Sequence, residues 1–168
     1  MREPVTATQA FELLIELGAS PWLLQHHELV HEVAVELCDR LVRDFEVPLD
    51  RTRVVVGAAL HDAGRITDVR PASHAAGERL LREHGVSAEL ARCCVSHATW
   101  DRGFPTLEEL LVALADVLWD GTRIAALEKR VVHGERPLWH DRARLSGRVG
   151  WRRKASHAVL GAGIALLL

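Results

Sequence analysis

The sequence is poor in several residue types, and each shortage narrows what the protein can be. Among 168 residues it has no tyrosine, one methionine and three cysteines. The cysteines, Cys38, Cys93 and Cys94, are odd in number and lack a C-x-x-C spacing. This argues against a disulfide framework and against a zinc site with sulfur ligands. We therefore expect a reducing compartment and a cytoplasmic location.

The chain also lacks a strong charge of either sign and a long apolar run. Because its net charge is only −2, we expect no nucleic-acid polymer as partner. No signal segment opens the chain, and residues 158–168 are apolar over only about half the length of a membrane span. We interpret them as a helix packed on the core and expect no membrane partner. One basic cluster is interpreted as a solvated helix face, and it comprises Arg142, Arg144, Arg148, Arg152, Arg153 and Lys154.

Apolar residues recur at steps of three and four through most of the chain, and no stretch alternates with period two. This pattern predicts an all-α protein. Since no repeat or long linker divides the chain, we expect residues 1–168 to form a single helical domain. Asp50 is expected to be an N-cap, and Thr106 with Glu109 predicts a capping box. The expected helices cover residues 11–17, 22–43, 54–60, 73–84, 87–97, 107–119 and 124–132, with a further helix near the C-terminus.

The stretch from Ala58 to Arg65 carries the main chemical signal. His61 and Asp62 are adjacent at the end of an apolar run and are followed by Gly64. Neighbouring residues on a helix diverge by about 100°, so both side chains reach one point only where the helix ends or bends. Gly64 is expected to supply that bend. An imidazole nitrogen beside a carboxylate oxygen suits a divalent metal ion, and Arg65 could hold a phosphate near it.

The expected helix over residues 22–43 offers several of the ten histidines. His26 lies four residues before Val30 in the apolar stripe, so it points inward. His27 is close to the same face and stays an alternative, whereas His31 is rotated away from it. An inward histidine can be a metal ligand, or it can be a core residue with its hydrogen bonds satisfied.

Three further side chains are candidates for the same site. His74 begins an expected helix in which Gly77 would let a neighbouring helix come close. His97 ends the next helix, beside a loop from which it can reach a cleft. Asp116 lies in an almost wholly apolar helix, where burying an uncompensated carboxylate would cost several kcal/mol. Either an arginine or a metal ion is expected to neutralise it.

Taken in order, these residues resemble the HD superfamily of metal-dependent phosphohydrolases. The first ligand helix is matched by His26 with Val30, the His-Asp corner by residues 59–65, and the last aspartate by residues 114–118. The resemblance covers about residues 21–125, with 126–168 as C-terminal helices. It implies an HD-type helical bundle with a metal centre in its core. The implied metal ligands are His26, His61, Asp62, His74, His97 and Asp116.

Two histidines between the His-Asp pair and the last aspartate resemble the binuclear branch of that superfamily. The resemblance implies two divalent metal ions, iron or manganese, with nickel, cobalt or zinc also able to bind. Asp62 would bridge the metals, and a bridging hydroxide would attack phosphorus. Arg65 would clamp the phosphate in the transition state. The implied substrate is a phosphomonoester, a nucleotide or a dinucleotide, and its further contacts would be Trp100, Arg102 and Arg123.

Two other functions stay open. The same ligand set occurs in mixed-valent diiron oxygenases of the superfamily, although Arg65 after the His-Asp corner favours hydrolysis. Alternatively, the histidines only stabilise the core of a non-catalytic, metal-free helical module. The sequence decides neither the substrate nor whether the protein is a monomer or a homodimer.

Overall fold

The computed structural model describes residues 4–67 and 74–133, and these residues contain helices and no strand, so the predicted all-α fold is confirmed. The predicted basic cluster at 142–154 and the predicted helix over 158–168 lie outside the described residues. The elements are α1 (Ala7–Glu16), α2 (Pro21–Phe45), α3 (Arg51–Leu60), the 3₁₀ helix η1 (Ala63–Ile66), α4 (His74–Glu83), α5 (Ala88–Ala91), α6 (Cys93–Ser96), α7 (Leu107–Leu118) and α8 (Ala125–His133).

The helix starts follow from local side-chain chemistry. Asp50 accepts a hydrogen bond from the backbone N–H of Arg53 and so caps α3, as predicted. Thr106 and Glu109 form the predicted capping box, in which each side chain accepts a hydrogen bond from the other residue's backbone N–H. These bonds satisfy donors that a helix start leaves unpaired. The two caps set where α3 and α7 begin.

The helix predicted over residues 87–97 is divided into α5 and α6. The division lies at Arg92, whose carbonyl accepts a hydrogen bond from the N–H of Val95, three residues on, at 2.9 Å. Such a bond tightens the turn from α-helical to 3₁₀ geometry. The chain therefore turns within this segment, and α6 runs from Cys93 to Ser96 toward the candidate site.

Two glycines bring α4 against the end of α3. A Cβ on Gly77 of α4 would lie 2.6 Å from the backbone nitrogen of Gly64, so a side chain there would collide with η1. The prediction that Gly77 permits a close helix approach is confirmed. Gly64 itself does not adopt a positive φ, because the chain leaves α3 through the 3₁₀ helix η1. The chain therefore changes direction over the whole of η1, and not at Gly64 alone as expected.

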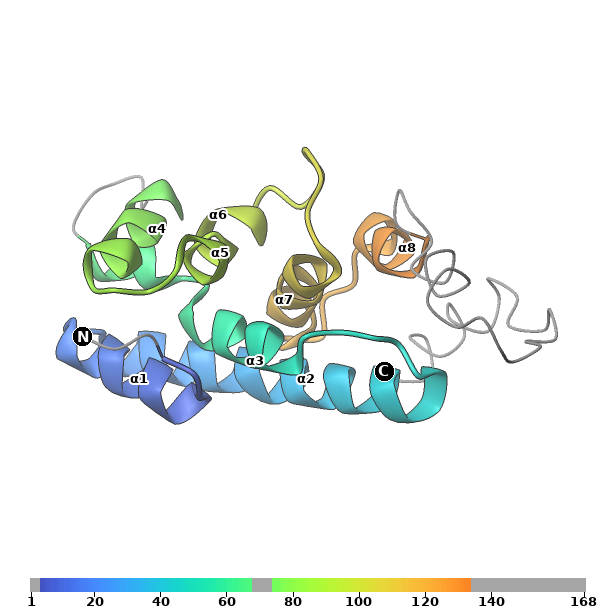
Figure 1. Cartoon of the computed structure of the whole chain (residues 1–168), viewed down its shortest axis with the longest axis horizontal. Coiled ribbons are helices and arrows are strands. Elements are labelled where there is room, and N and C mark those ends of the chain that lie inside the picture. Colours follow the sequence, from blue (N-terminus) through green and yellow to red (C-terminus); the bar gives the residue numbers. More distant parts are fainter. Residues whose placement is uncertain (1–3, 68–73, 134–168) are drawn as a thin grey trace, which may run out of the picture.

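Helix α3 lies at the centre of the molecule. In Figure 1, α2 runs along the base, with α4, α5 and α6 above one end of it and α7 and α8 above the other. α3 packs on α2, α7 and α1. Val54 and Ala58 of α3 belong to one hydrophobic cluster, with α2, α7 and α8, whereas Val56 and Leu60 belong to a second, with α1, α4 and α5. The C-terminal end of α3 therefore emerges between two apolar cores. No helix among the described residues is long and apolar enough to cross a membrane.

Candidate functional site: a buried histidine and aspartate cluster

The cluster is centred on the end of α3. His61 is the C-terminal cap of that helix, and Asp62 is the residue that leads into η1. The side chain of His61 is fully buried, and that of Asp62 is 6% exposed. Because the helix ends here, the two adjacent side chains face the same region, as the sequence predicted.

Helices α2 and α7 bring His26 and Asp116 to this point. The Nε2 atom of His26 lies 3.2 Å from Nε2 of His61. It also lies 3.4 Å from an oxygen of Asp116 and 3.6 Å from an oxygen of Asp62. Asp116 is in turn 3.2 Å from Nε2 of His61. Four polar side chains from separate parts of the sequence thus converge within hydrogen-bond or ion-pair distance.

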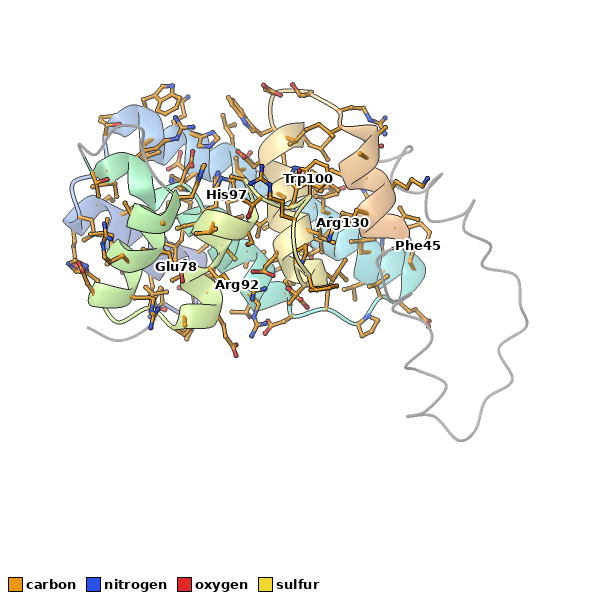
Figure 2. All side chains as sticks on the ribbon, turned by 90° about the horizontal axis from the view of Figure 1, so that it is seen from above. Phe45, Glu78, Arg92, His97, Trp100 and Arg130 are labelled. Atoms are coloured by element: carbon orange, nitrogen blue, oxygen red, sulfur yellow. The ribbon has the colours of Figure 1, made fainter. Side chains whose placement is uncertain are left out.

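His97 and His74 complete the group on the side of α6 and α4. Nε2 of His97 lies 3.6 Å from Asp62, and its ring is 5.0 Å from that of His74 between centroids. Figure 2 shows His97 at the middle of the molecule, seen from above. Ligand-type atoms lie within 4.8 Å of one another in three overlapping groups: His26, His61 and Asp62; His61, His97 and Asp116; Asp62, His74 and His97. The structure therefore brings together every residue of the predicted ligand set.

The backbone orients two of the imidazoles. Nδ1 of His61 is 2.7 Å from the carbonyl of Ala58, and Nδ1 of His97 is 2.8 Å from that of Cys93. Since a carbonyl only accepts, each Nδ1 donates its proton to the backbone, and each Nε2 faces the cluster. This arrangement is typical of histidines that bind metal ions. The Nε2 atoms of His26 and His61, so close together, need a proton or a cation between them.

The electrostatics of the cluster favour negative carboxylates beside a shared positive charge. Burial raises the pKa of Asp116, but hydrogen bonds from His26 and His61 outweigh it and hold that pKa far below its usual value. Burial lowers the pKa of His61, yet the hydrogen bond to Asp116 and its charge raise it overall. Burial and the nearby charge of His61 lower the pKa of His97 to about 4. No arginine pairs with Asp116 in the contacts of the described residues, so imidazoles neutralise it.

Two more histidines of α2, His27 and His31, contact backbone carbonyls and form no ion pair with Asp62 or Asp116. His27 is fully buried, with Nδ1 3.4 Å from the carbonyl of Ala58. Burial and the charge of His61 lower its pKa to about 3. His31 bonds the carbonyl of Val55 at 3.0 Å. The geometry thus separates His26 from its two neighbours.

The predicted substrate contacts are scattered. Arg65 forms an ion pair with Asp62 at the edge of the cluster. Trp100 packs against the hydrophobic cluster of α2, α7 and α8. Arg102 is exposed and lies 4.0 Å from Asp101. Arg123 pairs with Glu128. Of these four predicted substrate contacts, only Arg65 forms an ion pair with a residue of the cluster in the part of the chain that the structure describes.

The sequence reasoning missed two tryptophans beside the cluster. The ring of Trp22 is stacked on that of His26, with 5.8 Å between centroids. Trp119 meets the same imidazole edge-on, at 5.1 Å. Helical spacing contained the signal, because Trp22 precedes His26 by four residues and Trp119 follows Asp116 by three.

Comparison with known proteins finds relatives of another kind. The chain is 31% identical over 136 residues to a tRNA (cytidine(56)-2'-O)-methyltransferase of Thermoplasma volcanium, a match covering 71% of this chain and 38% of that protein. A protein of the same name from Picrophilus torridus is 30% identical over 151 residues, which is 80% of this chain and 42% of that protein. The chain thus spans less than half the length of these curated relatives. No family model and no solved structure matches it.

These names contradict the predicted membership of the HD superfamily. Proteins named for methylating tRNA are neither phosphohydrolases nor diiron oxygenases, so the predicted enzyme class and its oxygenase alternative are corrected. The motifs misled because each is only a few residues long. Imidazoles and carboxylates that converge in a core serve several kinds of chemistry, and their spacing does not specify a reaction.

The predicted cofactor and partners are corrected with that class. Methylation of a ribose hydroxyl breaks no phosphate ester, so it does not require two iron or manganese ions with a bridging hydroxide. The relatives are named for acting on tRNA, which contradicts both the small phosphorylated substrate and the expected absence of a nucleic-acid polymer. Net charge alone is a weak guide to RNA binding, because base stacking and local contacts do not depend on it.

Proposed function

We propose that this chain is a helical domain that takes part in the 2'-O-methylation of tRNA. The observation that supports this is the identity of about 30% to two proteins of that name, over 71% and 80% of the chain. We further propose that residues 1–168 form a single domain and that it works in the cytoplasm, where tRNA is modified. The activity named for the relatives belongs to proteins more than twice as long.

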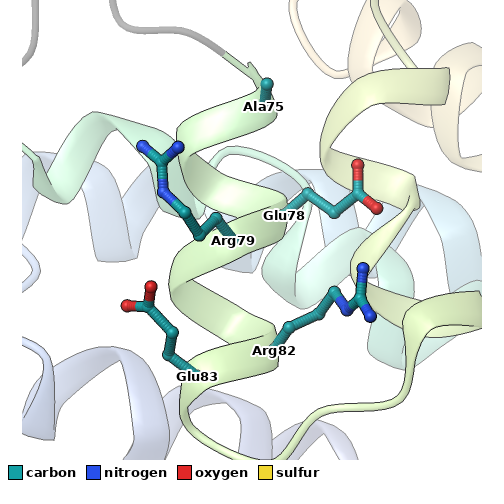
Figure 3. Close-up of a pocket in the computed structure, with 5 residues that line it drawn as sticks. All are labelled: Ala75, Glu78, Arg79, Arg82 and Glu83. Carbon is teal, nitrogen blue, oxygen red and sulfur yellow. The ribbon is translucent and has the colours of Figure 1, made fainter.

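The pocket along α4 does not fit the methyl donor. Transfer to a ribose hydroxyl forms a carbon–oxygen bond, and the usual donor, S-adenosylmethionine, needs a pocket with apolar walls for its adenine ring. The groove in Figure 3, of about 490 Å³, lies along α4 and is lined almost wholly by charged side chains. Its lining residues are Ala75, Glu78, Arg79, Arg82 and Glu83. We therefore propose that this chain handles RNA and does not itself transfer the methyl group.

Within that function, we propose that the cluster binds a metal ion with a structural role. The suggested ligands are those the sequence pointed to: His26, His61, Asp62, His74, His97 and Asp116. The ion would hold together side chains from α2, α4 and α7 and from the ends of α3 and α6. Its positive charge would offset the repulsion between the Nε2 atoms of His26 and His61. Arg65, paired with Asp62, is proposed to contact a phosphate of the RNA backbone.

The proposal is tested with the purified chain and an unmodified tRNA transcript. We expect the chain to bind the transcript in a filter-binding assay, with weak salt dependence because Arg65 is the one phosphate contact proposed. We expect no methyl incorporation from labelled S-adenosylmethionine by the chain alone. Failure to bind the transcript at low salt would overturn the role in tRNA methylation. Methyl transfer by the chain alone would overturn the restriction to RNA handling.

A further inference from the structure

Two indole rings flank His26, one of the imidazoles of the cluster. Trp22 lies nearly parallel to the ring of His26, at an interplanar angle of 7°, and Trp119 meets it at 76°. His26 itself is 8% exposed, whereas Trp22 is 59% exposed and Trp119 is 36% exposed. The cluster therefore approaches the surface between two aromatic side chains that keep a large part of their area open.

A cation lies beside the same opening. The guanidinium carbon of Arg65 is 5.8 Å from the ring centroid of Trp22, a distance at which a cation and an aromatic face attract each other. The side chain of Arg65 is 52% exposed, and its Nε is bonded to Asp62. Since an arginine has five N–H donors, this bond leaves others for a ligand. An exposed indole ring, that of Trp22, and a guanidinium group that could bind phosphate, that of Arg65, thus lie side by side.

We propose that Trp22 and Trp119 form a stacking site for an unpaired nucleobase of RNA, with Arg65 contacting the adjacent phosphate. The proposal rests on the proposed function, because that function supplies the RNA. The inference adds what the domain would recognise, namely a single-stranded nucleotide whose base stacks on the indole rings. Single-stranded bases are held on proteins by indole rings and guanidinium groups in this way.

The other exposed aromatic side chain offers a contrast. Phe104 is 85% exposed, more than either tryptophan, yet no ring, cation or ion-pair contact is associated with it among the described residues. It belongs to the turn between α6 and α7. Phe104 is therefore a matched control, since its removal deletes exposed aromatic area without touching the cluster.

The test uses cytidine 5'-monophosphate and ribose 5-phosphate as probes, with equilibrium dialysis of the full chain. We expect wild-type protein to bind the nucleotide about tenfold or more tightly than the sugar phosphate, because only the nucleotide has a base to stack. Trp22→Ala and Trp119→Ala should each weaken nucleotide binding about tenfold and leave ribose 5-phosphate unchanged. Phe104→Ala should bind both probes like wild type. Arg65→Gln should weaken both probes by a similar factor.

Folding is checked by circular dichroism, and Trp22→Leu and Trp119→Leu repeat the test with more apolar volume retained. Equal binding of the two probes by wild type, or nucleotide binding unchanged in the tryptophan variants, would overturn the stacking site. An unmodified tRNA transcript separates this inference from the proposed function. If the transcript binds equally to wild type and variants, the stacking site fails and the proposed function stands. If only the mononucleotide binds, in a tryptophan-dependent way, the stacking site stands and the role in tRNA methylation fails.

Discussion

Helix α7 carries two carboxylates in the interior, one near each end, and they are stabilised in different ways. Glu109 lies in the first turn and is 2% exposed, whereas Asp116 lies in the last turn with 26% of its side chain exposed. A helix favours negative charge at its N-terminus and disfavours it at its C-terminus. The same helix therefore stabilises one of these charges and opposes the other.

Glu109 has all the partners that it needs within the protein. It accepts hydrogen bonds from the guanidinium of Arg92, at 2.6 Å for one of them, and from the backbone N–H of Thr106 at 2.8 Å. Burial raises its pKa, but these bonds and the charge of Arg92 outweigh burial and lower it overall.

Among the described residues, Asp116 has only imidazoles as partners. Its oxygens face Nε2 of His26 and of His61 at 3.4 and 3.2 Å. Nδ1 of His26 is buried without a hydrogen-bond partner. The Glu109 site is thus complete as it stands, whereas the Asp116 site is the one proposed to take an added cation.

The largest effect is expected for Glu109→Ala. This change removes the capping box and the ion pair with Arg92, so it should lower the free energy of unfolding by about 3 kcal/mol. Urea denaturation followed by circular dichroism measures it, with and without added metal. The loss should be the same in both conditions. A loss that disappears when metal is added would contradict the view that this site is complete without a cation.

Metal binding should stabilise wild type nearly as much. With free Zn²⁺ or Mn²⁺ at a hundred times its dissociation constant, the expected gain is about 2.7 kcal/mol, seen as a higher Tm that a chelator reverses. Asp116→Ala and His61→Ala should abolish this gain, and Glu109→Ala should keep it. Elemental analysis of the untagged protein provides an independent measurement. An unchanged Tm, together with no metal retained, would contradict the proposed ligand set.

A smaller effect is expected on lowering the pH. The pKa of Glu109 is lowered in the folded protein from 4.5, so its contribution is present above 4.5 and is lost as the pH falls through that value toward the folded pKa. Because Arg92 is 49% exposed on its side chain, solvent screens part of this contribution. Urea midpoints between pH 6 and pH 3 measure it. Glu109→Gln should have a shallower acid slope, and an equal slope in both proteins would refute the assignment.

The smallest effect is expected for the exposed ion pair between Arg123 and Glu128. Arg123→Ala should leave the free energy of unfolding almost unchanged, because the Arg123 side chain is 42% exposed and solvent screens its charge. Thermal unfolding at low and high salt measures it, with Glu128→Gln as the matched variant. A change as large as that of Glu109→Ala would mean that exposure is a poor guide to these charge pairs.

The sequence predicted local features well. Asp50 and the pair Thr106 and Glu109 signal helix starts because capping depends on residues only three apart. The close approach at Gly77 also followed from the missing side chain. The division at Arg92 was not predictable, since it depends on a backbone bond within a segment of continuous helical pattern.

The candidate site was partly predictable. Adjacent His61 and Asp62 at a helix end, and an aspartate at position 116 in an apolar helix, pointed to a buried polar centre. Trp22 and Trp119 were not predicted, although their helical spacing from His26 and Asp116 contained the signal. The enzyme class was wrong, since the names of the relatives contradict it.

By itself the sequence determined the all-α class, the main helix starts and the identity of the polar residues in apolar surroundings, because period and capping are properties of neighbours along the chain. Only the tertiary structure decided that His26, His61 and Asp116 meet within 3.4 Å, and that Arg123 does not join them. The physical reason is that the packing of α2 and α7 on α3 sets these distances, and packing joins side chains separated by dozens of residues.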